Sequence, residues 1–128
     1  MVTFEDVAAL ATGLPEVTEG LRHGHRTWFV CGKGFAWERP LSKADRKRFG
    51  SETPPEGPIL ALAVEDLVGK EAVLEANAGA FFTIPHFDGY AAVLVRLEVI
   101  RKDALGEALL DAWLACAPDR LTEPYLEH

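Results

Sequence analysis

Apolar residues recur with the spacing of one helix face near both ends of the chain. After Thr3, whose side chain can cap a helix, they fall at Phe4, Val7, Ala8, Ala11 and Leu14. Asp103 is the expected cap of the last helix, whose apolar face is formed by Leu105, Leu109, Ala112, Trp113 and Cys116. We expect Gly13 and Pro15 to end the first helix and Pro118 to end the last.

Between these helices the apolar positions alternate or form short runs, as they do in strands. The pattern predicts strands over residues 17–23 (an irregular edge strand), 26–30, 35–38, 59–64, 81–84 and 90–99. The continuous apolar run from Ile59 to Val64 is typical of a central strand. Ser42 with Asp45 predicts a short capped helix to about Phe49, and a longer helix is expected over residues 65–77.

The second and third strands are expected to form a hairpin. A two-residue type II′ turn at Gly32 and Lys33 would place glycine first, as that turn requires. The turn predicts three opposed pairs, all on one sheet face: Val30 with Phe35, Trp28 with Trp37, and Arg26 with Arg39.

This order of elements predicts an α+β fold, an antiparallel sheet with helices packed on one side. The length of 128 residues fits one domain, which we assign to residues 1–125, with Leu126, Glu127 and His128 as the start of an expression tag.

No apolar run is long enough to cross a membrane, and the first residues lack a basic signal start, so the cytoplasm is the expected compartment. Cys31 and Cys116 are expected to be small buried residues.

Charge is distributed unevenly along the chain. The net charge is −7, but the segment from residue 22 to residue 48 has eight basic residues against two acidic ones, a net of +6. The rest has five basic and 18 acidic residues, a net of −13. The candidate anion-binding residues are therefore Arg22, Arg26, Lys33, Arg39, Lys43, Arg46, Lys47 and Arg48.

Five short stretches together resemble the MmcQ/YjbR family. They are Leu14–Glu19, Gly24-His25, Gly32–Trp37, Thr83–Tyr90 and Ala112–Pro118, which span nearly the whole chain in order. The resemblance implies a fold like that of CyaY, the bacterial frataxin. It also implies DNA binding through a proposed "double-wing" arrangement of hairpins, and it supplies no catalytic residues.

The residues themselves leave several functions open. The first hypothesis is a non-enzymatic module that binds DNA or another anion through the basic hairpin, with Trp28 and Trp37 either stacking on bases or facing the core. In the expected register Arg26 opposes Arg39, a repulsion that a bound phosphate would relieve.

A second hypothesis is a small-molecule or metal-binding protein that uses His23, His25, His86 and Asp88. Histidines in loops and edge strands are usually only solvated or hydrogen-bonded, and Glu5 and Asp6 alone make a poor iron ridge on the first helix. A third hypothesis is a protein-interaction domain that uses the aromatic sheet face.

No catalytic motif, glycine-rich phosphate loop or dinucleotide fingerprint is present, so neither an enzyme nor a cofactor is predicted. The expected partners are DNA or another anionic ligand and not a membrane, with the chain a monomer or weak homodimer.

Overall fold

The computed structural model describes residues 2–126 of the chain. Its elements in chain order are α1 (Phe4–Thr12), β1 (Val17–Arg22), β2 (His25–Val30), β3 (Lys33–Glu38), α2 (Lys43–Lys47), β4 (Ile59–Ala63), α3 (Leu67–Ala76), β5 (Phe81–Phe82), η1 (Pro85–Phe87), β6 (Ala92–Arg96), α4 (Lys102–Cys116) and α5 (Asp119–Leu126). Within the described residues no helix is long and apolar enough to cross a membrane.

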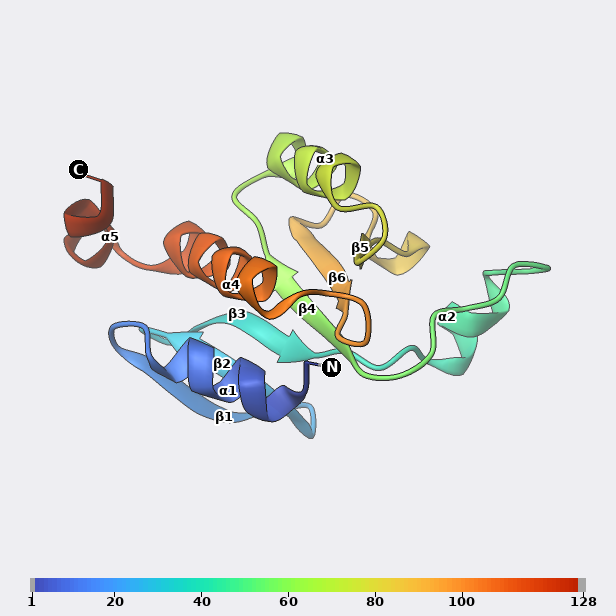
Figure 1. Cartoon of the computed structure of the whole chain (residues 1–128), viewed down its shortest axis with the longest axis horizontal. Coiled ribbons are helices and arrows are strands. Elements are labelled where there is room, and N and C mark those ends of the chain that lie inside the picture. Colours follow the sequence, from blue (N-terminus) through green and yellow to red (C-terminus); the bar gives the residue numbers. More distant parts are fainter. Residues whose placement is uncertain (1, 127–128) are drawn as a thin grey trace.

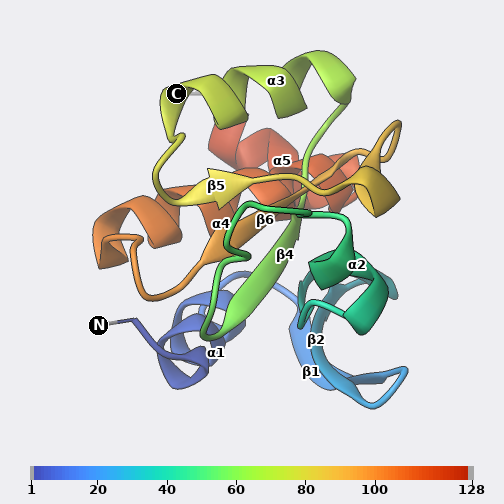
Figure 2. The same ribbon diagram turned by 90° about the vertical axis from the view of Figure 1, so that its right-hand side faces the viewer.

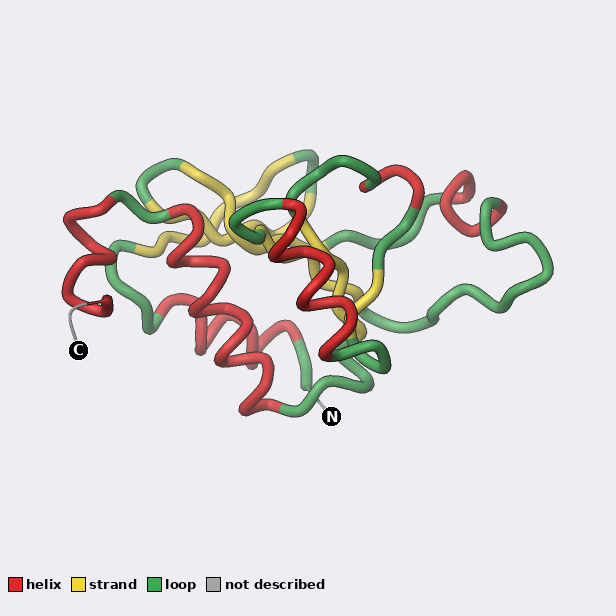
Figure 3. The backbone as a smooth tube through the Cα atoms, turned by 90° about the horizontal axis from the view of Figure 1, so that it is seen from above, coloured by secondary structure: helices red, strands yellow, loops and turns green. Residues whose placement is uncertain are grey.

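The six strands form one antiparallel sheet in the order β1-β2-β3-β4-β6-β5. The chain therefore has the expected α+β fold, with β1 at one edge and β4 inside the sheet. The longer helices lie on one side of the strands, as the view from above shows (Figure 3). The short helix α2 and the C-terminal α5 lie at opposite ends of the long axis (Figure 1), and α2 is nearest the viewer in Figure 2.

Two apolar clusters stabilise the two faces of this sheet. The larger one joins the helices to the face that carries Trp28, Ala36, Leu62 and Val93, which we call the helix face. The smaller one covers part of the opposite face, which carries Thr27, Trp37, Ala61 and Leu94 and which we call the far face. Leu41, Ile84 and Phe87, from the loops around α2 and η1, cover the far face over β4 and β6. Over residues 2–126 no long helix covers the far face, so it stays partly accessible beside β1 to β3.

The two N-terminal helix caps that the sequence predicts are present. The Thr3 side chain accepts a hydrogen bond from the Asp6 amide, and the Ser42 side chain accepts one from the Asp45 amide, each within a reciprocal capping box. The cap predicted at Asp103 is wrong, because α4 begins after Arg101 and Asp103 lies inside its first turn.

The chain after Pro118 departs from the expected end of the helical region. Pro118 does end α4, but a further helix, α5, follows it directly. Proline is favoured at the beginning of a helix as well as after its end. The Trp113 and Tyr125 rings meet edge to face with their centroids 5.1 Å apart, which ties α5 to α4.

The predicted register of the second hairpin is wrong, because the turn begins one residue earlier than expected. Cys31 (φ 49°) and Gly32 (φ 84°) are both left-handed, so they form the two central residues of the turn instead of Gly32 and Lys33. Val30 therefore pairs with Lys33, and an irregularity near Phe29 then places Trp28 opposite Ala36. The expectation that Cys31 is buried is also wrong, since it is exposed at this turn, whereas Cys116 is half-buried.

This register separates the two tryptophans. Trp28 is fully buried on the helix face, as the core interpretation predicts, while Trp37 pairs with Thr27 on the far face and is half-buried. The predicted pairing of Trp28 with Trp37 on one face is therefore wrong. Of the tag predicted at residues 126–128, Leu126 ends α5, and Glu127 and His128 lie outside the described residues.

Candidate functional site

A pocket of about 780 Å³ lies on the far face, where β1, β2 and β3 meet the loops around α2 and η1. The first hairpin contributes Arg22, His23, His25 and Thr27, and the end of β3 contributes Trp37 and Glu38. The following loop contributes Arg39, Pro40, Leu41 and Ser42, and the η1 region contributes His86, Phe87 and Tyr90. We call this site the Arg22 pocket.

The local backbone explains why the first hairpin points its basic residues into this pocket. His23 (φ 54°) and Gly24 (φ 78°) form a two-residue left-handed turn, and Arg22 is directly opposite His25 in the register. Because side chains alternate along a strand, Arg22, His25 and Thr27 share the far face. Histidine is one of the few non-glycine residues that tolerate a positive φ.

Arg22 is an exposed cation that is held in place by aromatic rings. Its guanidinium carbon lies 5.4 Å from the Trp37 ring centroid and 5.9 Å from that of Phe29. Gly34 makes room for it, since a Cβ there would lie 3.0 Å from both terminal guanidinium nitrogens. Within the described part of the chain, Arg22 forms no salt bridge. The two cation–π contacts hold the guanidinium beside the rings, and no carboxylate of the described residues neutralises its charge.

Arg39 is fixed by a carboxylate instead. Its Nη1 lies 3.0 Å from Oδ2 of the buried Asp45 and donates a hydrogen bond of 2.6 Å to the Pro40 carbonyl, while its guanidinium stacks on Phe87 at 5.5 Å. Burial raises the pKa of Asp45, but hydrogen bonds from Ser42 and the charge of Arg39 outweigh it, so the pKa lies below its ordinary value. Arg39 therefore keeps its position but is already partly neutralised.

Aromatic side chains form one wall of the Arg22 pocket. The centroids of Trp37 and Tyr90 are 6.4 Å apart, and the Phe87 and Tyr90 rings meet edge to face at 5.3 Å. Tyr90 is 48% exposed, so its ring is available to a ligand. The chain beneath this wall is held by Lys70 of α3, whose Nζ donates to the carbonyls of Phe87 and Tyr90.

The candidate basic residues are divided among several regions. Arg22 and Arg39 line the pocket, and the exposed Lys43, Arg46, Lys47 and Arg48 lie on α2 and directly after it. Lys33 follows the turn at the other end of the second hairpin.

The predicted pairing of Arg26 with Arg39 is wrong, and with it the repulsion argument for a bound phosphate. The Arg26 amide donates to Glu38, and its guanidinium is on the helix face, where Nη1 meets Glu5 at 2.8 Å and Nε meets Glu19 at 3.0 Å. Both carboxylates raise the pKa of Arg26 above its ordinary value. Arg26 is thus a structural cation that stacks on the buried Trp28.

Three of the four residues of the histidine hypothesis lie at one site. His23, His25 and His86 line the same pocket as Arg22, but Asp88 does not. Among the described residues no group of three or more His, Cys, Asp or Glu side chains is placed to hold a metal ion. The imidazoles instead add hydrogen-bond donors to a pocket that already has two guanidinium groups.

Phe87 and Tyr90 were absent from the candidate residues, although they form the aromatic wall. The turn-rich stretch around them gives no strand or helix signal that would show which side chain faces the sheet. The motif from Thr83 to Tyr90 was the available clue.

No family model matches the chain. The uncharacterized protein Rv2570 of Mycobacterium tuberculosis strain H37Rv is 46% identical over 129 residues, which cover 98% of this chain and 97% of that protein. The uncharacterized protein Mb2600 of Mycobacterium bovis matches to the same extent.

Among solved structures, the crystal structure of Deinococcus radiodurans protein DR2400, with a DUF419 domain, superposes with a TM-score of 0.63. That superposition covers 89% of this chain and 78% of the other, at 19% sequence identity, and it shows a shared fold. The identity and coverage of the mycobacterial matches decide the family: the chain belongs to the same family as Rv2570 and Mb2600.

Proposed function

We propose that the chain is a non-enzymatic binding module for a phosphate-bearing ligand, a DNA strand, which it contacts through the Arg22 pocket. Two guanidinium groups and three imidazoles would meet the phosphate, and the exposed ring of Tyr90 would stack on a base. The basic residues of α2 and the loop after it would extend the contact along the backbone of the strand.

The observation that carries this proposal is that Arg22 has no carboxylate partner among the described residues. The other two arginines of the hairpin region are matched to carboxylates, Arg26 to Glu5 and Glu19, and Arg39 to Asp45. Arg22 instead makes cation–π contacts with Trp37 and Phe29, and within the described residues it forms no salt bridge. A guanidinium held in this way is suited to an incoming phosphate.

The resemblance to the MmcQ/YjbR family supports the same proposal, since that family is associated with DNA binding through hairpins. The assignment to that family, a single domain over residues 1–125 and a cytoplasmic location are parts of the proposal. The fold shared with the DUF419 protein is in keeping with the family assignment.

The test is fluorescence anisotropy with short labelled single- and double-stranded DNA at two salt concentrations. Arg22→Ala is expected to weaken binding about 5- to 30-fold, the loss of about 1–2 kcal/mol from one charge-assisted contact. The slope of log affinity against log salt is expected to fall by about 1.

The matched control is Arg101→Ala, which removes one positive charge from a side chain that is 83% exposed and lies outside the pocket. It should leave affinity and salt slope close to those of the wild type. Equal losses of DNA affinity in both variants would show that only the net charge of the protein matters and not the pocket. Absence of DNA binding at low salt would refute the proposal.

The concave shape of the site favours one alternative ligand with the same chemistry. A volume of about 780 Å³ is in the range of small-molecule sites, so a free nucleotide would also fit. Competition by a nucleoside monophosphate distinguishes the two. Displacement of labelled DNA at equal concentrations would favour the nucleotide, whereas a need for a large excess would favour the strand.

A further inference from the structure

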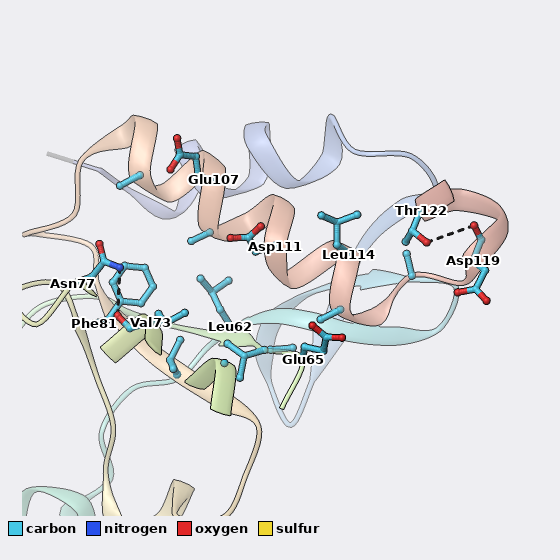
Figure 4. A pocket seen from close by; sticks show the side chains of 18 residues that line it. Leu62, Glu65, Val73, Asn77, Phe81, Glu107, Asp111, Leu114, Asp119 and Thr122 are labelled. Carbon is cyan, nitrogen blue, oxygen red and sulfur yellow. Dashed lines mark hydrogen bonds between the residues drawn. The ribbon is translucent and has the colours of Figure 1, made fainter. Parts of the chain in front are cut away.

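A second hollow, of about 670 Å³, lies on the helix face, between α3 and α4 and toward α5 (Figure 4). Its apolar lining comes from the sheet and both helices, including Leu62, Val73, Phe81 and Leu114. In Figure 4 the side chains of Leu62 and Val73 lie across the gap from Leu114 and the α4 backbone. This groove lies on the other side of the sheet from the Arg22 pocket, and no part of the proposed function uses it.

The sequence explains why the groove is not filled. Where α4 faces it, the side chains of Ala104, Ala108 and Ala115 are short, and α3 presents Gly69. A well-packed interface between two helices and a sheet normally uses larger residues at such positions. These small residues therefore leave a space with an apolar floor that is open to solvent at its rim.

The rim has charge of one sign. Four exposed carboxylates line the groove, those of Glu65, Glu107, Asp111 and Asp119, and among the described residues no Lys or Arg does so. Within the described residues, none of the four forms a salt bridge. Glu107 and Asp111 are one turn apart on α4, a spacing at which like charges destabilise a helix.

We propose that this groove binds a small organic cation with an apolar body, such as an aliphatic or aromatic amine. The apolar floor would bury the body of the ligand, and its ammonium group would lie at the rim between the carboxylates. The volume is in the range of small-molecule sites, and a cation would relieve the repulsion between Glu107 and Asp111. Charge complementarity selects the amine over an acid or an alcohol of the same shape.

Three probes that share one body test this assignment: phenylbutylamine, phenylbutanol and phenylbutanoate. Binding is followed by methyl and amide NMR shifts of the full chain. The amine is expected to shift signals of Leu62, Val73 and Leu114 saturably and to bind about 2- to 5-fold more tightly than the alcohol. The acid is expected to bind more weakly than both.

Two variants locate the site. Asp111→Asn should weaken binding of the amine about 2- to 5-fold and leave binding of the alcohol unchanged. The control is Glu75→Gln, at an exposed position of α3 outside the groove, which should change the affinity for neither probe. Ala108→Leu should fill the groove and abolish binding of all probes, with an unchanged melting temperature as the check on folding.

Equal binding of amine and acid, shifts centred on the Arg22 pocket, or no saturable shift with any probe would overturn the proposal. Arg22→Ala should bind the amine as the wild type does. Failure of the DNA proposal and failure of this one are therefore separate results.

Discussion

Lys70 reaches from α3 to the chain around η1, where its Nζ donates a hydrogen bond of 2.6 Å to the carbonyl oxygen of Phe87. The same ammonium donates to the Tyr90 carbonyl at 2.9 Å, and the side chain is almost fully buried. Burial lowers the pKa of Lys70, and the charge of Asp88 opposes that shift. One buried cation thus fixes the segment that forms the aromatic wall of the Arg22 pocket.

Lys70→Met should therefore damage both stability and the pocket. The substitution keeps an unbranched side chain but leaves two carbonyls without their donor, which should lower the free energy of unfolding by about 2–4 kcal/mol. Ligand binding at the Arg22 pocket should weaken as well, because Phe87 and Tyr90 lose their anchor. Denaturant unfolding and anisotropy measure the two effects, and Lys43→Met, at an exposed position of α2 with no salt bridge to the described residues, should unfold as the wild type does.

Arg22 and Arg26 should behave in opposite ways when each is replaced by alanine. Arg26→Ala removes two carboxylate partners and the stacking on Trp28, so it should destabilise the fold by about 1–2 kcal/mol but leave the salt dependence of DNA binding unchanged. Arg22→Ala should reduce binding with a smaller change in stability. Unfolding and binding measured on both variants decide this, and a lost salt slope in Arg26→Ala would contradict the assignment.

Asp45 should give the protein a component of acid sensitivity. Its pKa is lowered in the folded state, so the folded chain binds the proton less readily than the unfolded chain, and protonation favours unfolding. The stabilisation is present above the ordinary value of 3.8 and is lost as pH falls through the lowered pKa.

Asp45→Asn should unfold more easily at neutral pH by about 1–2 kcal/mol, because it weakens the hydrogen bond that the side chain accepts from the Ser42 amide and removes the ion pair with Arg39. Below pH 4 its difference from the wild type should shrink, as seen in denaturant midpoints across pH. A constant difference would show that Asp45 does not titrate with folding.

His23 allows binding and stability to be separated. Its φ of 54° is strained for a residue with a Cβ, so His23→Gly should leave the free energy of unfolding unchanged or raise it by up to about 1 kcal/mol. The same substitution removes an imidazole from the Arg22 pocket and should weaken binding of the anionic ligand. Weaker binding at equal or higher stability supports a ligand role, and unchanged binding would leave His23 a turn residue.

The turn at Cys31 and Gly32 makes its own prediction. A left-handed two-residue turn prefers Asn before Gly, so Cys31→Asn should raise the free energy of unfolding by about 0.5–1 kcal/mol. Gly32→Ala places a Cβ at φ 84° and should lower it by about 1 kcal/mol. If the type II′ turn at Gly32 and Lys33 were correct, Cys31→Asn would have no such benefit. Thermal melts of both variants decide between the two turns.

Local signals were sufficient for the overall layer arrangement. The caps at Thr3 and Ser42 and the apolar run at Ile59 depend on residues a few positions apart, and each is found where the pattern places it. The register of the second hairpin was not predictable in this way. Both candidate turns contain Gly32, and the choice between them depends on an irregularity in the pairing near Phe29.

The register shift near Phe29 accounts for the largest difference between the predicted and the observed candidate site. A slip of one residue turns side chains to the other face, so Trp37 and Arg39 of the third strand lie on the opposite face from Trp28 and Arg26. The carboxylate partners of Arg26 are Glu5, 21 residues away in sequence, and Glu19, seven residues away on the neighbouring strand. The pattern of residues around Arg26 does not reveal either contact. Arg22 and Arg39 of the basic segment line the pocket, and Arg22 is distinguished from the other arginines by its contacts with Trp37 and Phe29.

The sheet keeps the Arg22 pocket and the acidic groove on opposite sides of a fixed wall of strands. The carboxylates of the groove and the guanidinium groups of the pocket therefore stay apart, one set on each side of the sheet. A polyanion that approaches in solution meets attraction on one side and repulsion on the other before any contact forms. Such a molecule turns during the encounter, and its orientation on the ligand is selected by the long-range field before any hydrogen bond selects it.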